Sequence, residues 1–400
     1  MPTKLYFLNC IFIILILVVG IPKASVSAIN YQYIELTKMG EIGTGGDAYD
    51  IWVDENNELA YVTCGYFGFR IFNVSIPSNP ILLSHTPESP AIIETGHSTA
   101  FAHQMYVDTR EDIITYIGDG AGGLKIMNCS DPHNPYVIAT FAEGYAWTPV
   151  IIEDTGFVVN GFMGRGNPGF MIFNVSNPIN PSLIFNYTTS VDVVDLGLVD
   201  NRAYIATSNG EMIILDISNY SSPSVLGEYI GSLGSFLGEI EVFENIAFLV
   251  YWEDGLKICD ASDPLNITVI GIFEETHLTS FFLDVDTNIG YLASYDDGLV
   301  VLNLTDLTSP QEIGRYKDTG KVYRVMKRKN LIYITDQDEG LKILKMEFMN
   351  SSQTQISSST DSSFEKSFLS TSARIRNTST PSFELLVGIL VLLVTRKRKS

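Results

Sequence analysis

Between residues 33 and 348, apolar side chains recur in short runs in which apolar and polar positions alternate. In segment 240–272 the runs are Ile240–Val242, Ile246–Tyr251, Leu256–Cys259 and Ile267–Ile272, with Asn, Asp, Gly and Pro between them. A period of two is typical of half-buried strands, and these four residue types form the turns that join strands. No 3.6-residue period competes with this pattern. Each such segment therefore predicts a sheet of four short antiparallel strands.

One phrase recurs in each of these segments. It reads GLKIMNCSDPHNP from Gly123 and GLKICDASDPLN from Gly255, and related forms begin at Gly68, Gly169, Gly210, Gly298 and Gly340. The period is about 43 residues, which is the length of one four-stranded propeller blade. The seven copies predict an all-β fold, a seven-bladed β-propeller of four-stranded antiparallel blades that occupies residues 29–348.

The two ends of the repeat array complement each other. The last copy stops after Met346 without a fourth strand, whereas YIELTKMGEIG (33–43) resembles the fourth-strand runs PSVLGEY and PQEIGRY. Pairing of the first strand with the last blade would leave no open sheet edge in the ring. The strand pattern excludes a helical solenoid, and an open β-solenoid or a sandwich is the structural alternative.

The repeat has the form G-L-x-I-x-[DN]-x-S-x-P-x-x-P, and Tyr-[IVL]-[AT] precedes it, as at Tyr61, Tyr204 and Tyr333. This pattern resembles the LVIVD repeat of seven-bladed propellers on secreted and surface proteins of bacteria and archaea. The resemblance covers nearly all of 33–346. It implies the fold and a surface location, but no catalytic residues, because fold alone does not give function.

The first 28 residues have the composition of a targeting segment. Lys4 precedes an apolar run from Ile11 to Ile21, and Val26-Ser27-Ala28 supplies small residues where a signal peptidase cleaves. We expect a signal peptide that ends at Ala28. The alternative is a retained N-terminal membrane anchor, for which the apolar run is short of the roughly 20 residues that a span requires.

The C-terminal end has three parts. A Ser/Thr-rich stretch over 349–380 has too few apolar residues to form a core and predicts a disordered or glycosylated stalk. Residues 381–400 combine a short apolar run with the basic terminus RKRKS, which marks the cytoplasmic side of a transmembrane helix. This tail resembles an archaeosortase-type sorting signal, with TPSFE where the best-known version has Pro-Gly-Phe. The resemblance implies cell-surface display through the tail or through a lipid that replaces it.

The net charge narrows the choice of partner. The chain carries a formal charge of −21, and residues 31–348 hold 16 Lys/Arg against 43 Asp/Glu, a net of −27. Nucleic acid is excluded as a partner, because its binding depends on neutralisation of phosphates by basic residues. Such acidity favours a cation or a basic surface, or it serves only solubility and salt tolerance.

Four cysteines are too few and too scattered for a disulfide framework. Cys10 leaves with the signal peptide, and the odd remainder of Cys64, Cys129 and Cys259 cannot all pair. We expect the three to be small buried hydrophobic residues, not metal ligands.

Acidic residues gather at the predicted turns between the second and third strands. In a propeller these turns share one face, here called the top face, with the linkers that enter each blade. The carboxylates placed there are Asp119, Glu253, Asp254, Asp296, Asp297, Asp336, Asp338 and Glu339. Such a rim suits Ca²⁺ or a basic or hydroxyl-rich partner. The alternative is ordinary turn chemistry, since Asp and Gly supply the backbone conformations that hairpins require.

An insertion in the linker between the first two repeats adds further polar groups to the same face. Segment 85–103 holds His85, His97 and His103 together with Glu88 and Glu94. Long loops in compact repeats are more often functional than structural, but this spacing matches no recognised metal-ligand signature. The sequence leaves three roles open for the aromatic residues near this face: stacking on a sugar, covering a partner, or packing between blades. These residues are Tyr66, Phe67, Trp147, Phe162 and Trp252.

Nine Asn-x-Ser/Thr sequons are candidates for N-glycosylation. They lie at Asn73, Asn128, Asn174, Asn186, Asn219, Asn266, Asn303, Asn350 and Asn377. Six of them fall at the corner after the third strand, on the face opposite the top. Glycans there would coat the bottom face and leave the top face open; alternatively, Asn at several of these corners simply replaces a turn Asp.

These observations predict a non-enzymatic binding module on the cell surface, which recognises a protein, a glycan or another envelope component through its acidic top face and the 85–103 loop. Two alternatives remain: a secreted carbohydrate-active hydrolase or lyase with a carboxylate pair on the top face, and a structural envelope protein. A carboxylate with a raised pKa in the central cavity would favour the enzyme. An aromatic-lined rim would favour the binding module.

Overall fold

The computed structural model describes residues 33–86, 101–141, 145–162, 165–231 and 235–349. The described residues form strands and turns, and no helical segment among them has the length and hydropathy of a membrane span. The expected signal peptide, most of the stalk and the C-terminal tail lie outside the described residues.

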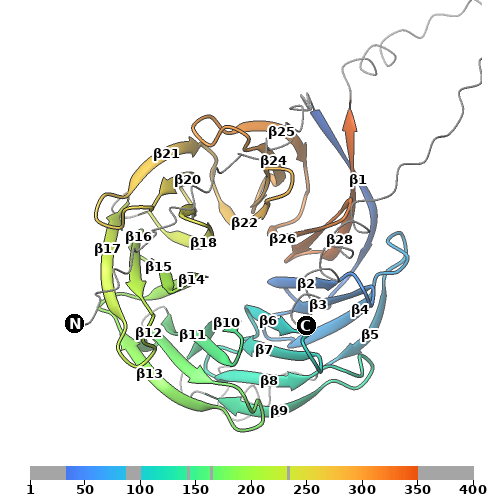
Figure 1. The fold of residues 1–400 in the computed structure, drawn as a ribbon. Coiled ribbons are helices and arrows are strands. Elements are labelled where there is room, and N and C mark those ends of the chain that lie inside the picture. Colours follow the sequence, from blue (N-terminus) through green and yellow to red (C-terminus); the bar gives the residue numbers. More distant parts are fainter. Residues whose placement is uncertain (1–32, 87–100, 142–144, 163–164, 232–234, 350–400) are drawn as a thin grey trace, which may run out of the picture. The chain divides into compact units, whose positions relative to one another are not determined.

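The strands form seven four-stranded antiparallel sheets arranged in a ring, as Figure 1 shows, and we call the central axis of this ring the channel. The first three blades are β2 (Asp50–Asp54), β3 (Leu59–Thr63), β4 (Phe69–Asn73) and β5 (Ile81–His85); β6 (Met105–Asp108), β7 (Ile114–Gly118), β8 (Leu124–Asn128) and β9 (Tyr136–Phe141); and β10 (Ala146–Ile152), β11 (Thr155–Phe162), β12 (Arg165–Asn174) and β13 (Ser182–Thr188). Within each blade the first strand lies next to the channel and the fourth on the outside (Figure 1).

The next three blades repeat this order. They are β14 (Val193–Val199), β15 (Arg202–Thr207), β16 (Glu211–Asp216) and β17 (Ser224–Ile230); β18 (Leu237–Phe243), β19 (Ile246–Tyr251), β20 (Gly255–Asp260) and β21 (Thr268–Phe273); and β22 (Leu278–Asp284), β23 (Ile289–Ser294), β24 (Gly298–Asn303) and β25 (Gln311–Tyr316). The predicted all-β fold of seven four-stranded blades is confirmed.

The seventh blade closes the ring with the start of the chain. It contains β26 (Val322–Arg328), β27 (Leu331–Asp336), β28 (Gly340–Met349) and, as its outer strand, β1 (Tyr33–Ile42). β1 runs antiparallel to β28 from the pair Tyr33 and Met349 to the pair Ile42 and Leu341. The predicted closure is therefore correct, and it covers the edge that β28 would otherwise expose.

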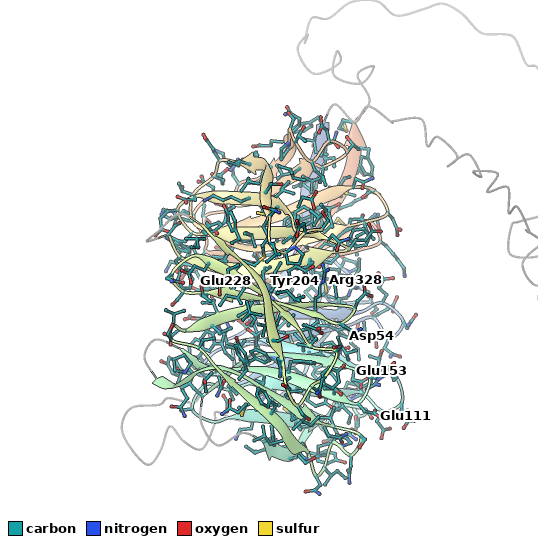
Figure 2. The ribbon with its side chains drawn as sticks, turned by 60° about the vertical axis from the view of Figure 1, so that its left-hand side comes forward. Asp54, Glu111, Glu153, Tyr204, Glu228 and Arg328 are labelled. Atoms are coloured by element: carbon teal, nitrogen blue, oxygen red, sulfur yellow. The ribbon has the colours of Figure 1, made fainter. Side chains whose placement is uncertain are left out.

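The core lies between neighbouring sheets. The repeated Tyr on the second strand is buried, as at Tyr61, Tyr204 and Tyr291, and its cluster includes residues of the adjacent blade. Figure 2 shows Tyr204 within the stack of sheets and Glu228 on the outer strand β17. Because a blade alone is too small to bury its faces, packing against both neighbours stabilises each sheet.

The repeated Gly is explained by backbone conformation. Every one of the seven repeat glycines has a positive φ, for example +79° at Gly255 and +87° at Gly298. A Cβ at Gly255 would lie 2.2 Å from the carbonyl oxygen of Phe273. The turn into the third strand therefore requires glycine.

The three described cysteines, Cys64, Cys129 and Cys259, are free and buried. Burial raises the pKa of the thiols, to about 12 at Cys64 and to about 11 at Cys129. They act as small core residues, as the sequence predicts.

Candidate functional site

The innermost strand of each blade carries one polar residue at the same register. These residues are Asp50, Gln104, Thr148, Asp195, Glu239, Ser280 and Arg324, and we call them the polar ring. In five blades their partners on the second strand are equivalent: Thr63, Ala206, Val250, Ala293 and Thr335 face Asp50, Asp195, Glu239, Ser280 and Arg324. Because the blades share one strand order and these five share one register, this position forms a belt around the channel.

The residue that precedes each polar-ring position lies one step closer to the top face. These residues are Tyr49, His103, Trp147, Val194, Gly238, Thr279 and Tyr323, and we call them the upper ring. Tyr323, Tyr49, His103 and Trp147 are large and come from four consecutive blades, the seventh to the third. The remaining three come from the fourth to the sixth blades and are small. At the level of the upper ring, large rings therefore stand on one side of the channel mouth and small side chains on the other.

This asymmetry leaves a pocket of about 680 Å³ at the mouth of the channel. All seven upper-ring residues line it, and Gln104 and Arg324 of the polar ring form part of its floor. The rest of the lining comes from linkers and top-face turns: Tyr66, Phe101, Tyr145, Phe236, Leu278, Trp252, Tyr295 and Gln337. The volume is within the range of small-molecule sites, about 300 to 1,000 Å³.

Contacts between rings fix the aromatic wall. The rings of His103 and Trp147 stack at a centroid distance of 3.8 Å, and Phe101 lies parallel to Trp147 at 6.3 Å. The Nε2 atom of His103 lies 3.0 Å from the hydroxyl of Tyr323. Burial, and then the positive charge of Arg324, lower the pKa of His103 well below its usual value, so this imidazole is neutral.

The end of the 85–103 insertion is anchored to the first blade. Ala102 and Gly65 exchange backbone hydrogen bonds of 3.0 and 3.1 Å, and the Thr63 hydroxyl donates to the carbonyl of His103 at 2.5 Å. This anchor brings Phe101 and His103 into the pocket lining. His97, Glu88 and Glu94 lie outside the described residues.

A single guanidinium holds a group of carboxylates below the wall. The Nε atom of Arg324 donates to Oδ1 of Asp50 at 2.9 Å, and Nη1 lies 2.8 Å from Oε2 of Glu239. Asp50 and Asp195 also join blades, because their Oδ2 atoms accept from the backbone N–H groups of Met105 at 2.8 Å and Ile240 at 3.0 Å. One cation therefore faces several acidic groups inside the channel.

Two carboxyls of this cluster, Glu239 and Asp195, have raised pKa values. Burial raises the pKa of Glu239 to about 8, although Arg324 lowers it, and the nearby Asp195 adds to the rise. Burial also raises the pKa of Asp195 to about 6. Glu241, two residues further along β18 than Glu239, is exposed.

Three of the predicted binding residues line the pocket: His103, Trp147 and Trp252. The eight predicted carboxylates, all of them described, lie outside its lining. Four of them contact a lysine: Asp254 with Lys257, Asp338 with Lys321, and Asp336 and Glu339 with Lys342. Asp296 lies 2.7 Å from the Nδ1 atom of His277.

The other three predicted carboxylates hold turns and loops. Glu253 accepts from the backbone N–H of Phe236 at 3.3 Å, Asp297 donates its N–H to the carbonyl of Ser294, and Asp119 is buried at its turn. The eight carboxylates therefore do not converge on a common point.

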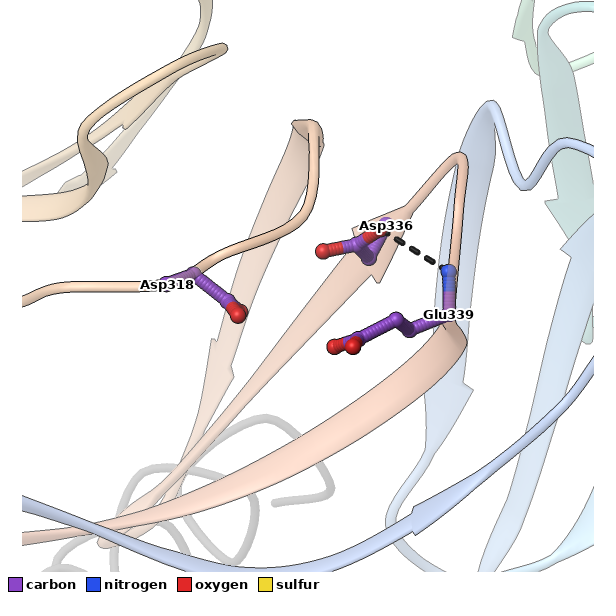
Figure 3. Close-up of side chains that lie close together, drawn as sticks. All are labelled: Asp318, Asp336 and Glu339. Carbon is purple, nitrogen blue, oxygen red and sulfur yellow. Dashed lines mark hydrogen bonds between the residues drawn. The ribbon is translucent and has the colours of Figure 1, made fainter.

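The densest carboxylate group on the top face lies in the seventh blade. Figure 3 shows Asp318, Asp336 and Glu339 directed toward one another, and their oxygens lie within 4.8 Å. The buried ammonium of Lys342 occupies the space between them, 2.5 Å from Asp318 and 2.9 Å from Asp336, and in contact with Glu339. Lysine thus supplies the positive charge that a Ca²⁺ ion would supply, and this group does not fit a metal.

The corner sequons adopt the turn that the repeat requires. The Oδ1 atom of Asn73 accepts from the backbone N–H of Ser75 at 3.0 Å, and Asp260 makes the equivalent contact with Ser262 at 2.9 Å. Asn128, Asn174 and Asn303 make the same turn. Asn219 makes the next turn of the corner, where Asp131 and Asp263 stand in other repeats. Asn186 lies on β13 and Asn266 in the corner after β20; Asn350 and Asn377 lie outside the described residues. Glycosylation of these residues stays a prediction.

The polar ring, Tyr49 and Tyr323 were not predicted from the sequence. A signal existed, since Thr148, Asp195, Glu239 and Arg324 each stand nine residues before the buried aromatic of the second strand. A polar residue at a fixed position in otherwise apolar first strands marks the channel. Of the other predicted aromatics, Tyr66 lines the pocket and Phe67 is exposed, whereas the side chain of Phe162 is outside the described part.

The family model for the LVIVD repeat matches six segments of the chain, 45–86, 114–142, 162–189, 192–230, 238–275 and 284–318. Together they cover more than half of the 400 residues. The chain belongs to the LVIVD repeat family. The six segments correspond to the first six blades, and the seventh, which combines the two ends of the array, is outside the match. No curated protein matches this LVIVD-repeat chain significantly.

Solved structures share the fold of this LVIVD-repeat protein at low sequence identity. The computationally designed protein Ika8 is 10% identical with a TM-score of 0.55, over 77% of this chain and 99% of that one. Raptor from Chaetomium thermophilum is 10% identical with a TM-score of 0.63, over 80% of this chain and 29% of that one. The WD40 β-propeller domain of Doa1 is 10% identical with a TM-score of 0.61, over 78% and 97%. These similarities show the fold alone.

Proposed function

We propose that this LVIVD-repeat protein is a binding module that holds a group of its ligand, from a protein or a glycan of the cell envelope, in the pocket at the channel mouth. It acts at the cell surface, where its C-terminal tail or a replacing lipid attaches it to the membrane. The observation that supports binding is the asymmetric upper ring, in which Val194, Gly238 and Thr279 stand opposite four large rings. A purely structural ring gives no reason for this difference in size between the two sides of the upper ring.

Gly238 offers a direct test. A Cβ at this position would meet its nearest neighbours at 3.6 to 3.8 Å, which is ordinary contact, and Gly238 does not have a left-handed φ. Gly238→Leu therefore fills the pocket without distorting β18. Gly43→Leu is the matched control, because a Cβ there would meet nothing within 4 Å.

Saturation-transfer NMR with a library of small neutral, anionic and cationic compounds measures the binding. We expect at least one class to bind the wild-type chain and Gly43→Leu, and to lose binding in Gly238→Leu. Binding that is equal in all three proteins, or absent from the wild type, contradicts the proposal.

A second candidate function is a carbohydrate-active hydrolase or lyase. It is favoured by Glu239, a carboxyl with a raised pKa next to the pocket, because a protonated carboxyl can act as a general acid. Release of reducing sugar or unsaturated product from polysaccharides by the wild type, with loss in Glu239→Gln, would support this function. Release by neither protein, or equal release by both, would exclude a role for Glu239.

A further inference from the structure

The walls of the channel pocket restrict the shape of its ligand. Tyr49, Phe101 and Trp147 stand on one side, and Trp252 and Tyr295 stand on the other, with their rings 5.3 Å apart at an interplanar angle of 58°. Aromatic faces favour a flat partner that has apolar surface on at least one face. Macromolecular surfaces do not enter a pocket of about 680 Å³, so one ring or a pair of linked rings is the appropriate size.

The floor restricts the charge of the ligand. Among the described residues, the Arg324 side chain pairs with Asp50 through Nε and with Glu239 through Nη1. Of these three charged groups, Arg324 alone belongs to the lining of the pocket. A cationic ligand would therefore lie against a guanidinium, and an anionic ligand would meet a guanidinium whose charge two carboxylates already offset. Either would have to lose its hydration without gaining an unpaired opposite charge. An uncharged ligand avoids both penalties.

The floor and wall also carry hydrogen-bonding groups. Gln104 and Arg324 place an amide and a guanidinium on the floor, and His103 adds an imidazole to the wall. Among the described residues, the Nδ1 atom of His103 is buried and has no hydrogen-bond partner. Polar groups that line a pocket are normally paired, so this lining points to a polar ligand. Hydroxyl groups both donate and accept, and therefore suit an imidazole, an amide and a guanidinium alike.

We infer that the pocket binds an uncharged saccharide, with a C–H face of the sugar ring against the aromatic wall and its hydroxyl edge toward Gln104 and Arg324. This inference rests on the proposed binding function and names its ligand class. A pyranose combines the three required properties, since it has an apolar face, a rim of hydroxyls and no charge.

The test uses the full chain and four soluble probes: cellobiose and maltose as neutral saccharides, glucosamine as a cation and glucuronate as an anion. Binding is followed by the fluorescence of Trp147 and Trp252 and by calorimetry. We expect saturable binding of at least one neutral disaccharide, and affinity at least tenfold weaker for glucosamine and glucuronate. Trp252→Ala and Gly238→Leu should each weaken disaccharide binding at least tenfold, whereas Trp252→Phe and Gly43→Leu should retain it.

The outcomes separate this inference from the proposed function. Binding of only the charged probes, lost in Gly238→Leu, overturns the saccharide inference but leaves a binding pocket. Disaccharide binding that persists in both Gly238→Leu and Trp252→Ala places the sugar elsewhere and also overturns the inference. If no probe binds while the compound library reveals a non-saccharide ligand in this pocket, the saccharide inference alone fails.

Discussion

The channel carboxylates make the stability of the propeller depend on pH, and Glu239 provides the sharpest test. Its pKa rises from an ordinary value of 4.5 to about 8 because the folded chain buries it. Between these two values the folded state binds more protons than the unfolded state. The free energy of unfolding therefore falls as pH rises through this window, and Glu239→Gln, which resembles the protonated side chain, removes the contribution of this group.

The magnitude follows from the width of the window. Each pH unit contributes at most about 1.4 kcal/mol per proton, so a window from 4.5 to about 8 sets an upper limit of about 5 kcal/mol. Asp195 repels Glu239 and shares the titration, which spreads the effect over both groups. We expect Glu239→Gln to gain about 2 to 4 kcal/mol relative to the wild type between pH 5 and pH 9, because this range covers only part of the window.

Urea unfolding at pH 5, 6, 7, 8 and 9, followed by fluorescence and circular dichroism, measures this difference. The comparison of two proteins cancels the titration of shared groups that do not interact with Glu239. Glu228→Gln, an exposed residue on the outer strand β17, is the matched control and should run parallel to the wild type. If Glu239→Gln also runs parallel to the wild type across this range, Glu239 does not titrate as we infer.

Three further predictions concern closure, the lysine site and the thiols. Ile34 is a fully buried side chain of β1, so Ile34→Ala should lower the free energy of unfolding in urea titrations by about 2 to 5 kcal/mol. A change below about 0.5 kcal/mol would show that β1 does not close the ring. Lys342→Met leaves three carboxylates without their cation and should lower the free energy of unfolding by about 3 to 5 kcal/mol. Added Ca²⁺ should restore part of this loss in thermal melts, and the control Lys345→Met should show neither effect. A loss of stability that calcium does not reduce would contradict the argument. Cys259 is buried, and burial raises the pKa of its thiol to about 12. We therefore expect it to react with a thiol reagent only after unfolding, which peptide mapping of the labelled protein measures. Labelling of Cys259 in the native chain would contradict its burial.

The two features that would distinguish a binding module from an enzyme occur together in this molecule. The mouth of the channel has an aromatic-lined rim, and the channel below it has carboxyls with raised pKa values. Arg324 connects the two, because it lines the pocket and also pairs with the carboxylates. The reaction assay with Glu239→Gln and the binding assay with Gly238→Leu therefore address different layers of one site.

Local sequence patterns determined the fold of this protein. Alternation of apolar and polar residues gives the strands, the positive φ at positions such as Gly255 gives the turns, and the missing strand after Met346 gives the closure by β1. Each of these depends on residues within one repeat or on a count of repeats. One copy of the repeat is a weak indication of a blade, but seven similar copies together are a strong indication of a seven-bladed propeller.

The pocket was decided by the tertiary structure. Arg324 and Asp50 are 274 residues apart in the chain, and His103 and Tyr323 are 220 apart, yet each pair is in contact. The sequence placed His103, Trp147 and Trp252 on the correct face, but it could not show that four large rings oppose three small side chains. That asymmetry arises only when the ring closes and places equivalent positions of different blades around one channel. At these positions the side chains differ in size and charge from blade to blade.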